Sequence, residues 1–169
     1  KRIAKFHKVS EERFVADWKD TFPETQESAI TDIYNEIKLP ARATAGSAGY
    51  DFYAPVDLTL NPGETVKIPT DPRRDGAGLG SECYPRSGLG FKYRLQLNNT
   101  VGIIDSDYFY SDNEGHIFAK ITNDSNEGKS VSIQAGTGFM QGIFVEYGIT
   151  VDDDAKGVRN GGFGSTTQK

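Results

Sequence analysis

Acidic side chains at the ends of apolar segments are the residues of this sequence best suited to chemistry. Asp105 and Asp107 directly follow the apolar run at residues 101–104. Tyr108 comes next. Paired carboxylates bind metal ions or transfer protons, although such a pair also marks many ordinary turns. Asp51 interrupts another apolar, aromatic segment, where a carboxylate needs a partner. A buried structural aspartate fits that position as well as a functional one.

Two glycine-rich segments have the composition of an anion-binding loop. In residues 85–92, glycines let backbone N–H groups turn toward an anion, Ser87 adds a donor and Arg86 adds a bidentate charge. This segment lacks the lysine–serine/threonine ending of a P-loop, and a plain turn has the same composition. Residues 159–166 add an aromatic side chain suited to cover a flat ligand, and a disordered tail is the alternative. Gln141 lies among apolar residues, so we expect its amide to have a fixed partner in the protein or in a ligand.

The first forty residues predict two helices. Ser10 followed by two glutamates is typical of a helix start, with a cap and acids near the positive end. Apolar residues recur at helical spacing as far as Pro23, which ends this helix, and again from about residue 25 to Pro40. We expect both apolar faces to pack on the main domain. The residues of these faces are Phe14, Val15, Trp18, Phe22, Ala29, Ile30, Ile33 and Ile37.

From Ala48 onward the apolar pattern has a period of two, which indicates short strands. Pro62 followed by Gly63 suits the middle of a type II turn. In the last alternating segment, Phe139 and Gln141 are expected on the same face. Many short strands joined by glycine-rich turns predict a mainly β fold, an antiparallel barrel or sandwich. The alternating segments are residues 57–60, 65–68, 117–121, 131–133 and 139–147.

Residues 71–81 do not fit this pattern. They contain three glycines and a proline and show no alternation, although a strand is needed at this point to lead into Cys83. The segment is interpreted either as a genuine loop or as a local sequence error, such as a frameshift that a second one restores. An intact mass that matches the sequence would remove the second interpretation.

Length and composition set the class of protein. The chain has 169 residues, which fits one domain with a small extension. It is 36% hydrophobic and 25% charged, as globular chains are. The net charge of −5 argues against broad binding to nucleic acid or to an anionic membrane. The longest apolar stretch, near residues 138–145, is far shorter than the ~20 residues of a membrane-spanning helix.

The cysteine and histidine content argues against a structural zinc site. The chain has one cysteine, Cys83, and two histidines, His7 and His116. We expect Cys83 to be a small buried residue and both histidines to be surface or packing residues rather than ligands. A single cysteine and no visible secretory signal favour a cytoplasmic location.

Taken together and in order, five segments resemble the trimeric deoxyuridine triphosphatase (dUTPase) family. The resemblance spans about residues 39–166 and implies a jelly-roll-like β domain at 39–150 that assembles as a homotrimer with shared active sites. It implies that residues 151–169 form a flexible arm that closes the site. Residues 1–38 resemble the mainly helical extension of some Gram-positive bacterial members. The five segments are residues 48–54, 85–92, 98–108, 136–143 and 159–166.

The resemblance also implies the reaction: dUTP and water give dUMP and pyrophosphate, with Mg²⁺ as cofactor. Such an enzyme limits uracil incorporation into DNA and supplies dUMP for thymidylate synthesis. Asp105 corresponds to the general base that activates water for in-line attack on the α-phosphorus. Tyr108 corresponds to the residue beneath the deoxyribose that excludes a 2′-hydroxyl. Asn99 corresponds to the residue at the uracil, where the hairpin backbone reads the base edge.

The remaining implied roles concern the phosphates and the base. Asp51 is expected to support the hydration of Mg²⁺, with no protein group bound directly to the metal. Phe163 is expected to stack on the uracil. The residues expected near the phosphates are Arg86, Ser87, Gly88, Gln141, Arg159, Gly164, Ser165 and Thr166.

Two departures from the family pattern and two alternative functions remain. The family's glycine two residues after the tyrosine is replaced by a longer segment, residues 109–115, and residues 71–81 replace an expected apolar strand. A dCTP deaminase, which resembles dUTPase in fold, is the nearest alternative enzyme. A regulatory module that binds a protein partner and is switched by nucleotide is the alternative from another class.

Overall fold

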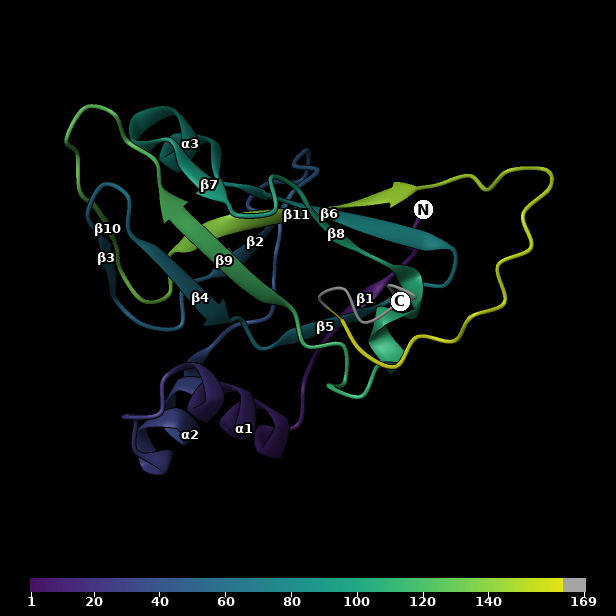
Figure 1. Ribbon diagram of the computed structural model, residues 1–169, viewed down its shortest axis with the longest axis horizontal. Helices are drawn as coiled ribbons and strands as arrows, with labels where there is room; N and C mark the ends of the chain where they lie inside the picture. The colour runs from purple at the N-terminus through teal and green to yellow at the C-terminus, as the bar shows by residue number, and fades with distance from the viewer. Residues whose placement is uncertain (163–169) are drawn as a thin grey trace.

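The computed structural model describes residues 1–162, in which β-strands are the main element (Figure 1). All paired strands are antiparallel. The strands are β1 Lys5–Lys8, β2 Tyr50–Tyr53, β3 Leu58–Leu60, β4 Thr65–Pro69, β5 Pro72–Asp75, β6 Leu79–Pro85, β7 Leu95–Leu97, β8 Gly102–Ile104, β9 Phe118–Asn123, β10 Val131–Ile133 and β11 Gly138–Glu146. The helices are α1 Glu11–Thr21, α2 Glu27–Glu36, α3 Ser87–Tyr93 and the 3₁₀ turn η1 Ser106–Tyr110.

The strands form a four-stranded sheet in the order β2-β11-β6-β8 and a three-stranded sheet in the order β4-β9-β7. Two further pairs, β3 with β10 and β1 with β5, complete the β domain. Chain neighbours enter different sheets, as in a jelly roll. The prediction of a mainly antiparallel, jelly-roll-like β fold is therefore confirmed. Within residues 1–162, none of the helices is both long and apolar enough to cross a membrane.

The core lies between the sheets and follows the predicted alternation in part. Ile117, Ala119 and Ile121 are all buried, as expected for one face of a strand. In β11 the prediction is wrong. A register shift between Gly138 and Met140 interrupts the pairing with β2. Because a bulge adds a residue to one strand, Phe139 and Met140 are both buried, and Phe139 does not share a face with Gln141.

The predicted type II turn is present between β3 and β4. Gly63 has a φ of +85°, and the N–H of Glu64 donates to the carbonyl of Asn61 over 3.0 Å. Only glycine adopts this φ without strain. The strands on either side pair elsewhere, β3 with β10 and β4 with β9.

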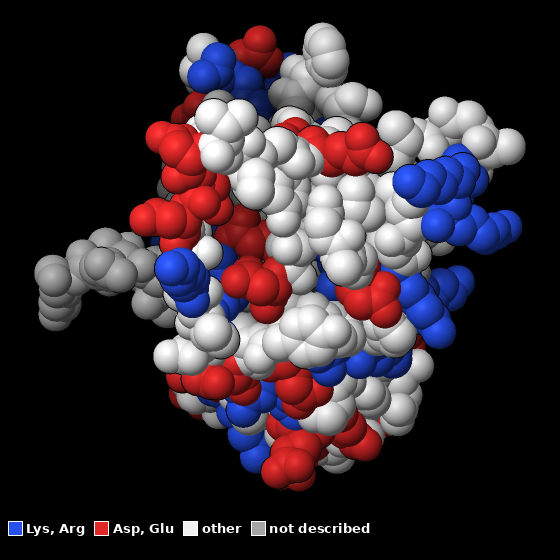
Figure 2. Space-filling model, turned by 90° about the vertical axis from the view of Figure 1, so that its right-hand side faces the viewer, with Lys and Arg blue, Asp and Glu red and all other residues white. Residues whose placement is uncertain are grey.

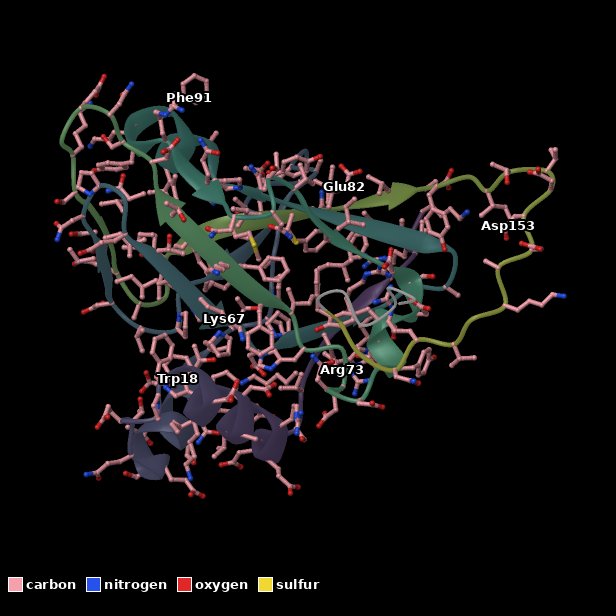
Figure 3. The ribbon with its side chains drawn as sticks, viewed as in Figure 1. Trp18, Lys67, Arg73, Glu82, Phe91 and Asp153 are labelled. Atoms are coloured by element: carbon pink, nitrogen blue, oxygen red, sulfur yellow. The ribbon has the colours of Figure 1, made fainter. Side chains whose placement is uncertain are left out.

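Both predicted helices of the extension are present. α1 begins after Ser10, whose hydroxyl accepts the N–H of Arg13 over 3.1 Å. α2 begins two residues later than predicted and ends at Glu36, well before Pro40. Trp18, labelled in Figure 3, belongs to a buried cluster with Val9, Phe14, Ile30 and Ile37. The extension thus has its own small core, which packs beneath the β domain at β4.

The interpretation of residues 71–81 as a loop is wrong. The segment contains β5, the first residues of β6 and a tight turn in which Gly76 and Gly78 have positive φ. β5 pairs with β1, a strand of the extension that the sequence did not predict. Arg74, and not an apolar residue, occupies a buried position of β5, where it donates to the carbonyls of Leu79 and Ile104, each over 2.8 Å.

A buried acid lies where the extension meets the β domain. Asp71 is fully buried, and its carboxylate lies 3.1 Å from the ammonium of Lys8. Burial raises the pKa of Asp71 to about 6, because desolvation disfavours the charged form more than Lys8 favours it.

This pKa predicts how stability depends on pH. The folded state holds the proton of Asp71 up to about pH 6, whereas the unfolded chain releases it near its ordinary value of 3.8. The contribution of Asp71 to stability is therefore fully present below pH 3.8 and lost as pH rises to about 6, by at most about 3 kcal/mol. Urea unfolding from pH 4 to 7, at fixed protein concentration, should show wild-type stability falling relative to Asp71→Asn. A constant difference between the two proteins would contradict the shift.

Candidate functional site

A pocket of about 550 Å³ opens beside β8 and contains part of the predicted site. Its walls come from the β7–β8 connection, the segment after β8, the beginning of β9 and the tail. The predicted site residues that line it are Asn99, Asp105, Tyr108 and Arg159. Apolar walls with a few convergent polar groups are typical of a small-molecule site.

The connection between β7 and β8 is a tight turn. Thr100 has a φ of +67°, and its N–H donates to the carbonyl of Leu97 over 2.9 Å. At Gly102 an added Cβ would lie 3.2 Å from the Cβ of Cys83 on β6, so glycine allows the two strands to approach. Asn99 is exposed at the tip of this turn.

Asp105 and Asp107 share one cationic partner. Arg159 pairs with Asp105 through Nη2 and donates from Nε to Oδ1 of Asp107 over 2.8 Å. Both carboxylates are 55% exposed, whereas the arginine is 14% exposed. The N–H of Asp112 donates to the carbonyl of Asn160 over 2.7 Å and fixes the same part of the tail. In the described residues, the tail up to residue 162 therefore packs against residues 105–112 of the same chain.

Tyr108 also lines the pocket. Its hydroxyl donates to the carbonyl of His116 over 2.6 Å and accepts from Nδ2 of Asn113 over 2.9 Å. Burial raises the pKa of Tyr108, so the hydroxyl stays protonated and can donate. The ring packs against Gly162, where an added Cβ would lie 2.7 Å from Cε2.

A second group of predicted residues lies on β2, β11 and the start of α3. Asp51 and Gln141 are directly opposite each other in the β2–β11 ladder. Arg86 pairs with Asp51, and Nε2 of Gln141 donates to the carbonyl of Pro85 over 3.3 Å. The predicted fixed partner of Gln141 is thus a protein carbonyl.

Residues 85–92 do not form a plain turn. Arg86 is the N-cap residue of α3, and Ser87 and Gly88 are its first two residues, both exposed. The first N–H groups of a helix have no partner within the helix, so these two amides are available to an anion.

Within one chain these two groups are separate. The described lining of the pocket includes none of Asp51, Arg86, Ser87, Gly88 and Gln141. α3 and the segment around η1 lie on opposite sides of the molecule (Figure 1). Phe163, Gly164, Ser165 and Thr166 lie outside the described residues.

Several residues that shape these groups were not predicted. Gly138 makes room for the Asp51–Arg86 pair, because an added Cβ would lie 3.1 Å from Cβ of Asp51 and 3.2 Å from Nη1 of Arg86. Gly162 and Asn113 contact Tyr108. Their sequence signal is weak, since a glycine shows its role only when its neighbours in space are known.

Figure 2 shows a broad uncharged area on the upper part of one face, with acidic side chains mainly to its left and basic ones to its right. Charges of both signs are mixed below it. Among residues 1–162, no group of three or more histidine, cysteine, aspartate or glutamate side chains is arranged to hold a metal ion. Cys83 is buried, as expected, and burial raises the pKa of its thiol to about 12.

Comparison with known proteins identifies the family. A family model described as dUTPase matches residues 35–167. The deoxyuridine 5′-triphosphate nucleotidohydrolase of Hahella chejuensis is 41% identical over 146 residues, which cover 80% of this chain and 90% of that protein. Among solved structures, the dUTPase of Streptococcus mutans is 29% identical with a TM-score of 0.61, over 88% of this chain and 98% of that one. A dUTPase of phage phi11 of S. aureus, solved with a structural Mg(II) ion, shows the fold alone at 18% identity, with a TM-score of 0.61, over 92% of this chain and 98% of that one. This chain belongs to the dUTPase family.

Proposed function

We propose that this chain is a dUTP diphosphatase that hydrolyses dUTP to dUMP and pyrophosphate. The observation that carries the proposal is Asp105, an accessible carboxylate that directly follows β8 and lines an apolar pocket together with Asn99 and Tyr108. Family membership supports the same substrate. The product dUMP is a precursor for thymidylate synthesis, and removal of dUTP limits uracil incorporation into DNA.

Asp105 is proposed to act as the general base. It takes a proton from a water molecule, which attacks the α-phosphorus in line, and pyrophosphate leaves. The ion pair with Arg159 is part of this mechanism. Guanidinium groups bind phosphates in a bidentate manner, so an incoming triphosphate competes with Asp105 for Arg159. Transfer of the arginine to the outer phosphates would free the carboxylate to accept a proton.

The pocket supports selection of base and sugar. The turn at Asn99 presents backbone N–H and C=O groups, which can pair with the edge of uracil and leave the reversed pattern of cytosine unpaired. The ring of Tyr108 is fixed by two hydrogen bonds, which supports its proposed place beneath the deoxyribose. Phe163, in the part of the tail beyond the described residues, is proposed to cover the base.

Mg²⁺ is proposed to bind mainly through the substrate phosphates and water. Mg²⁺ keeps much of its hydration shell, so one nearby carboxylate is enough to hold it through water. Asp51 fits this role, since Arg86 engages only Oδ2. When bound, the ion would neutralise charge on the phosphates.

The separation of the two groups supports a homotrimeric enzyme with shared sites. Asp51, Arg86 and Gln141 are proposed to hold the phosphates of a nucleotide whose base and sugar lie in the pocket of a neighbouring copy. The tail is proposed to reach across and close such a shared site. A cytoplasmic location stays a prediction from the single cysteine. The family match favours this hydrolase over a dCTP deaminase or a regulatory module.

A pyrophosphate-release assay tests the substrate. We expect release from dUTP in the presence of Mg²⁺. We expect little release from dATP, dCTP or dGTP, whose base edges do not match that of uracil, and little from dTTP, whose methyl group would clash. The same incubations should yield no ammonia from dCTP. Ammonia release without pyrophosphate would identify a deaminase instead.

Asp105→Asn tests the base. The amide keeps the shape of the carboxylate but does not accept the proton, so kcat should fall by at least about 100-fold while nucleotide affinity is largely kept. Asp112→Asn is the matched control, since its side chain is exposed and only its backbone N–H holds the tail. Unchanged kcat in Asp105→Asn would contradict the assignment.

A mixture of the Asp105→Asn and Arg86→Ala variants tests whether the active site is shared between chains. Each protein alone should be nearly inactive. In trimers reassembled from both, sites that combine Arg86 of one chain with Asp105 of another should restore up to about a quarter of wild-type activity. A site contained within one chain would give no recovery.

Gly162→Ala tests the docking of the tail. The added Cβ would overlap the ring of Tyr108, so the tail should lift and Arg159 should leave its acidic partners. Trypsin cleavage after Arg159, followed by mass spectrometry, should become several-fold faster. Gly157→Ala is the control, because nothing lies within 4 Å of its added Cβ. Equal cleavage rates in the two variants would contradict the contact.

A further inference from the structure

A buried histidine connects the helical extension to the wall of the pocket. The imidazole of His116 is 0% exposed. Its Nδ1 lies 2.6 Å from Oδ2 of Asp17 on α1, and its Nε2 accepts the backbone N–H of Asp71 over 3.0 Å. The ring packs between the rings of Phe14 and Phe118. Two polar contacts and two aromatic neighbours thus hold the histidine in one position.

These contacts define the tautomer of His116. Nε2 faces a donor, so it must carry the lone pair, and the ring proton lies on Nδ1, which donates to Asp17. Burial lowers the pKa of His116, which agrees with a neutral ring. The Asp17 carboxylate is 15% exposed and has Arg13 at 3.7 Å on the preceding turn of α1.

The backbone of the same histidine holds Tyr108. The carbonyl of His116 accepts the phenolic hydroxyl over 2.6 Å. The N–H of His116 donates to the carbonyl of Asn113 over 3.2 Å, and the amide of Asn113 donates to the same hydroxyl. A displacement of His116 therefore moves both groups that fix the tyrosine.

Further contacts attach residues 109–115 to the N-terminal part of the chain. Ser10 donates from its backbone N–H to Oε1 of Glu114 over 2.9 Å and from its hydroxyl to Oε2 over 2.6 Å. Arg73 of β5 donates to the carbonyl of Phe109 over 2.6 Å and lies against its ring (Figure 3). At Gly115, whose φ is +68°, an added Cβ would lie 2.7 Å from the carbonyl oxygen of Tyr108. Residues 109–115 are thus tightly docked, and the partners of Phe109 and Glu114 belong to the extension and β5.

We propose that Asp17, acting through His116, is a positioning residue for Tyr108, so that the helical extension contributes to the selection of deoxyribose over ribose. This inference rests on the proposed dUTP diphosphatase activity, in which Tyr108 lies beneath the sugar. A 2′-hydroxyl on the sugar is excluded only while the ring of Tyr108 cannot move away from it. The ring is held by the hydroxyl at its far end, and that hydroxyl depends on the backbone of His116. Loss of Asp17 leaves the Nδ1–H of a buried imidazole without its partner, so His116 shifts to find another acceptor.

The test is the ratio of kcat/KM for dUTP to kcat/KM for UTP. Asp17→Ala should lower this ratio by about fivefold to tenfold, chiefly because UTP becomes a better substrate. Asp17→Asn keeps an acceptor for the Nδ1–H and should retain most of the wild-type ratio. Asp20→Ala is the matched control, since Asp20 is an exposed acid on the same helix. A general loosening of the fold would reduce activity on both nucleotides and leave the ratio unchanged.

A double-mutant cycle tests the path through the hydroxyl. Tyr108→Phe removes the group that His116 holds, so it should lower the ratio by itself, and Asp17→Ala should have no further effect in that background. Additive effects of the two changes would overturn the proposal. If Asp17→Ala does not fold, the Tyr108→Phe variant alone tests the proposal. An unchanged dUTP/UTP ratio in Tyr108→Phe would overturn the proposal as well.

NMR spectroscopy of His116 tests this inference independently of dUTP hydrolysis. With two histidines in the chain, nitrogen chemical shifts of the imidazoles are readily assigned by comparison with His7→Gln. The proposal requires His116 to be neutral with its proton on Nδ1 in the wild type, and the Nδ1 chemical shift to change in Asp17→Ala as the hydrogen bond to Asp17 is lost. A proton on Nε2 in the wild type would overturn it, whatever the enzyme hydrolyses. Absence of dUTP hydrolysis in the wild type would instead refute the proposed function.

Discussion

The register of the four-stranded sheet determines where both groups of candidate residues lie. β11 pairs on one side with β2, which sets Gln141 opposite Asp51, and on the other side with β6, which sets Gln141 opposite Tyr84. β6 in turn pairs with β8, so the end of β8 and Asp105 are fixed by the same hydrogen-bond ladder. A slip of one residue would turn every side chain to the opposite face. The bulge near Gly138 adjusts this register at the point where Arg86 meets Asp51.

Regular elements could be predicted because each one carries its own local signal. Ser10 and the apolar face of α1 predict a capped helix, and Pro62 with Gly63 predicts a turn. The pair of β1 with β5 carries no such signal. Its strands are about 70 residues apart, and a buried position of β5 holds the cation Arg74 rather than an apolar side chain. Long-range pairing and charge burial depend on the assembled molecule, so neither could be predicted from alternation.

The candidate side chains could be predicted, whereas the residues that hold them could not. Asp105 and Tyr108 belong to a recognisable sequence motif. They lie close together in space because they are three residues apart in the chain. The part played by His116 depends on a helix almost one hundred residues away, so a lone histidine in the sequence indicated only packing. The same applies to Gly162, whose importance comes from the ring beside it. Local order identifies the reactive groups, but tertiary contacts determine how firmly they are held.

The pairing of β1 with β5 also has a consequence for solubility. An unpaired strand at the margin of a sheet presents free amide and carbonyl groups, to which another polypeptide can attach as an additional strand. β1 occupies that margin of β5 along all four of its residues. A shortened protein that begins at the β domain would uncover this template and invite self-association. Residues 5–8 therefore supply the strand partner of β5, and their loss would leave β5 without one among the described residues.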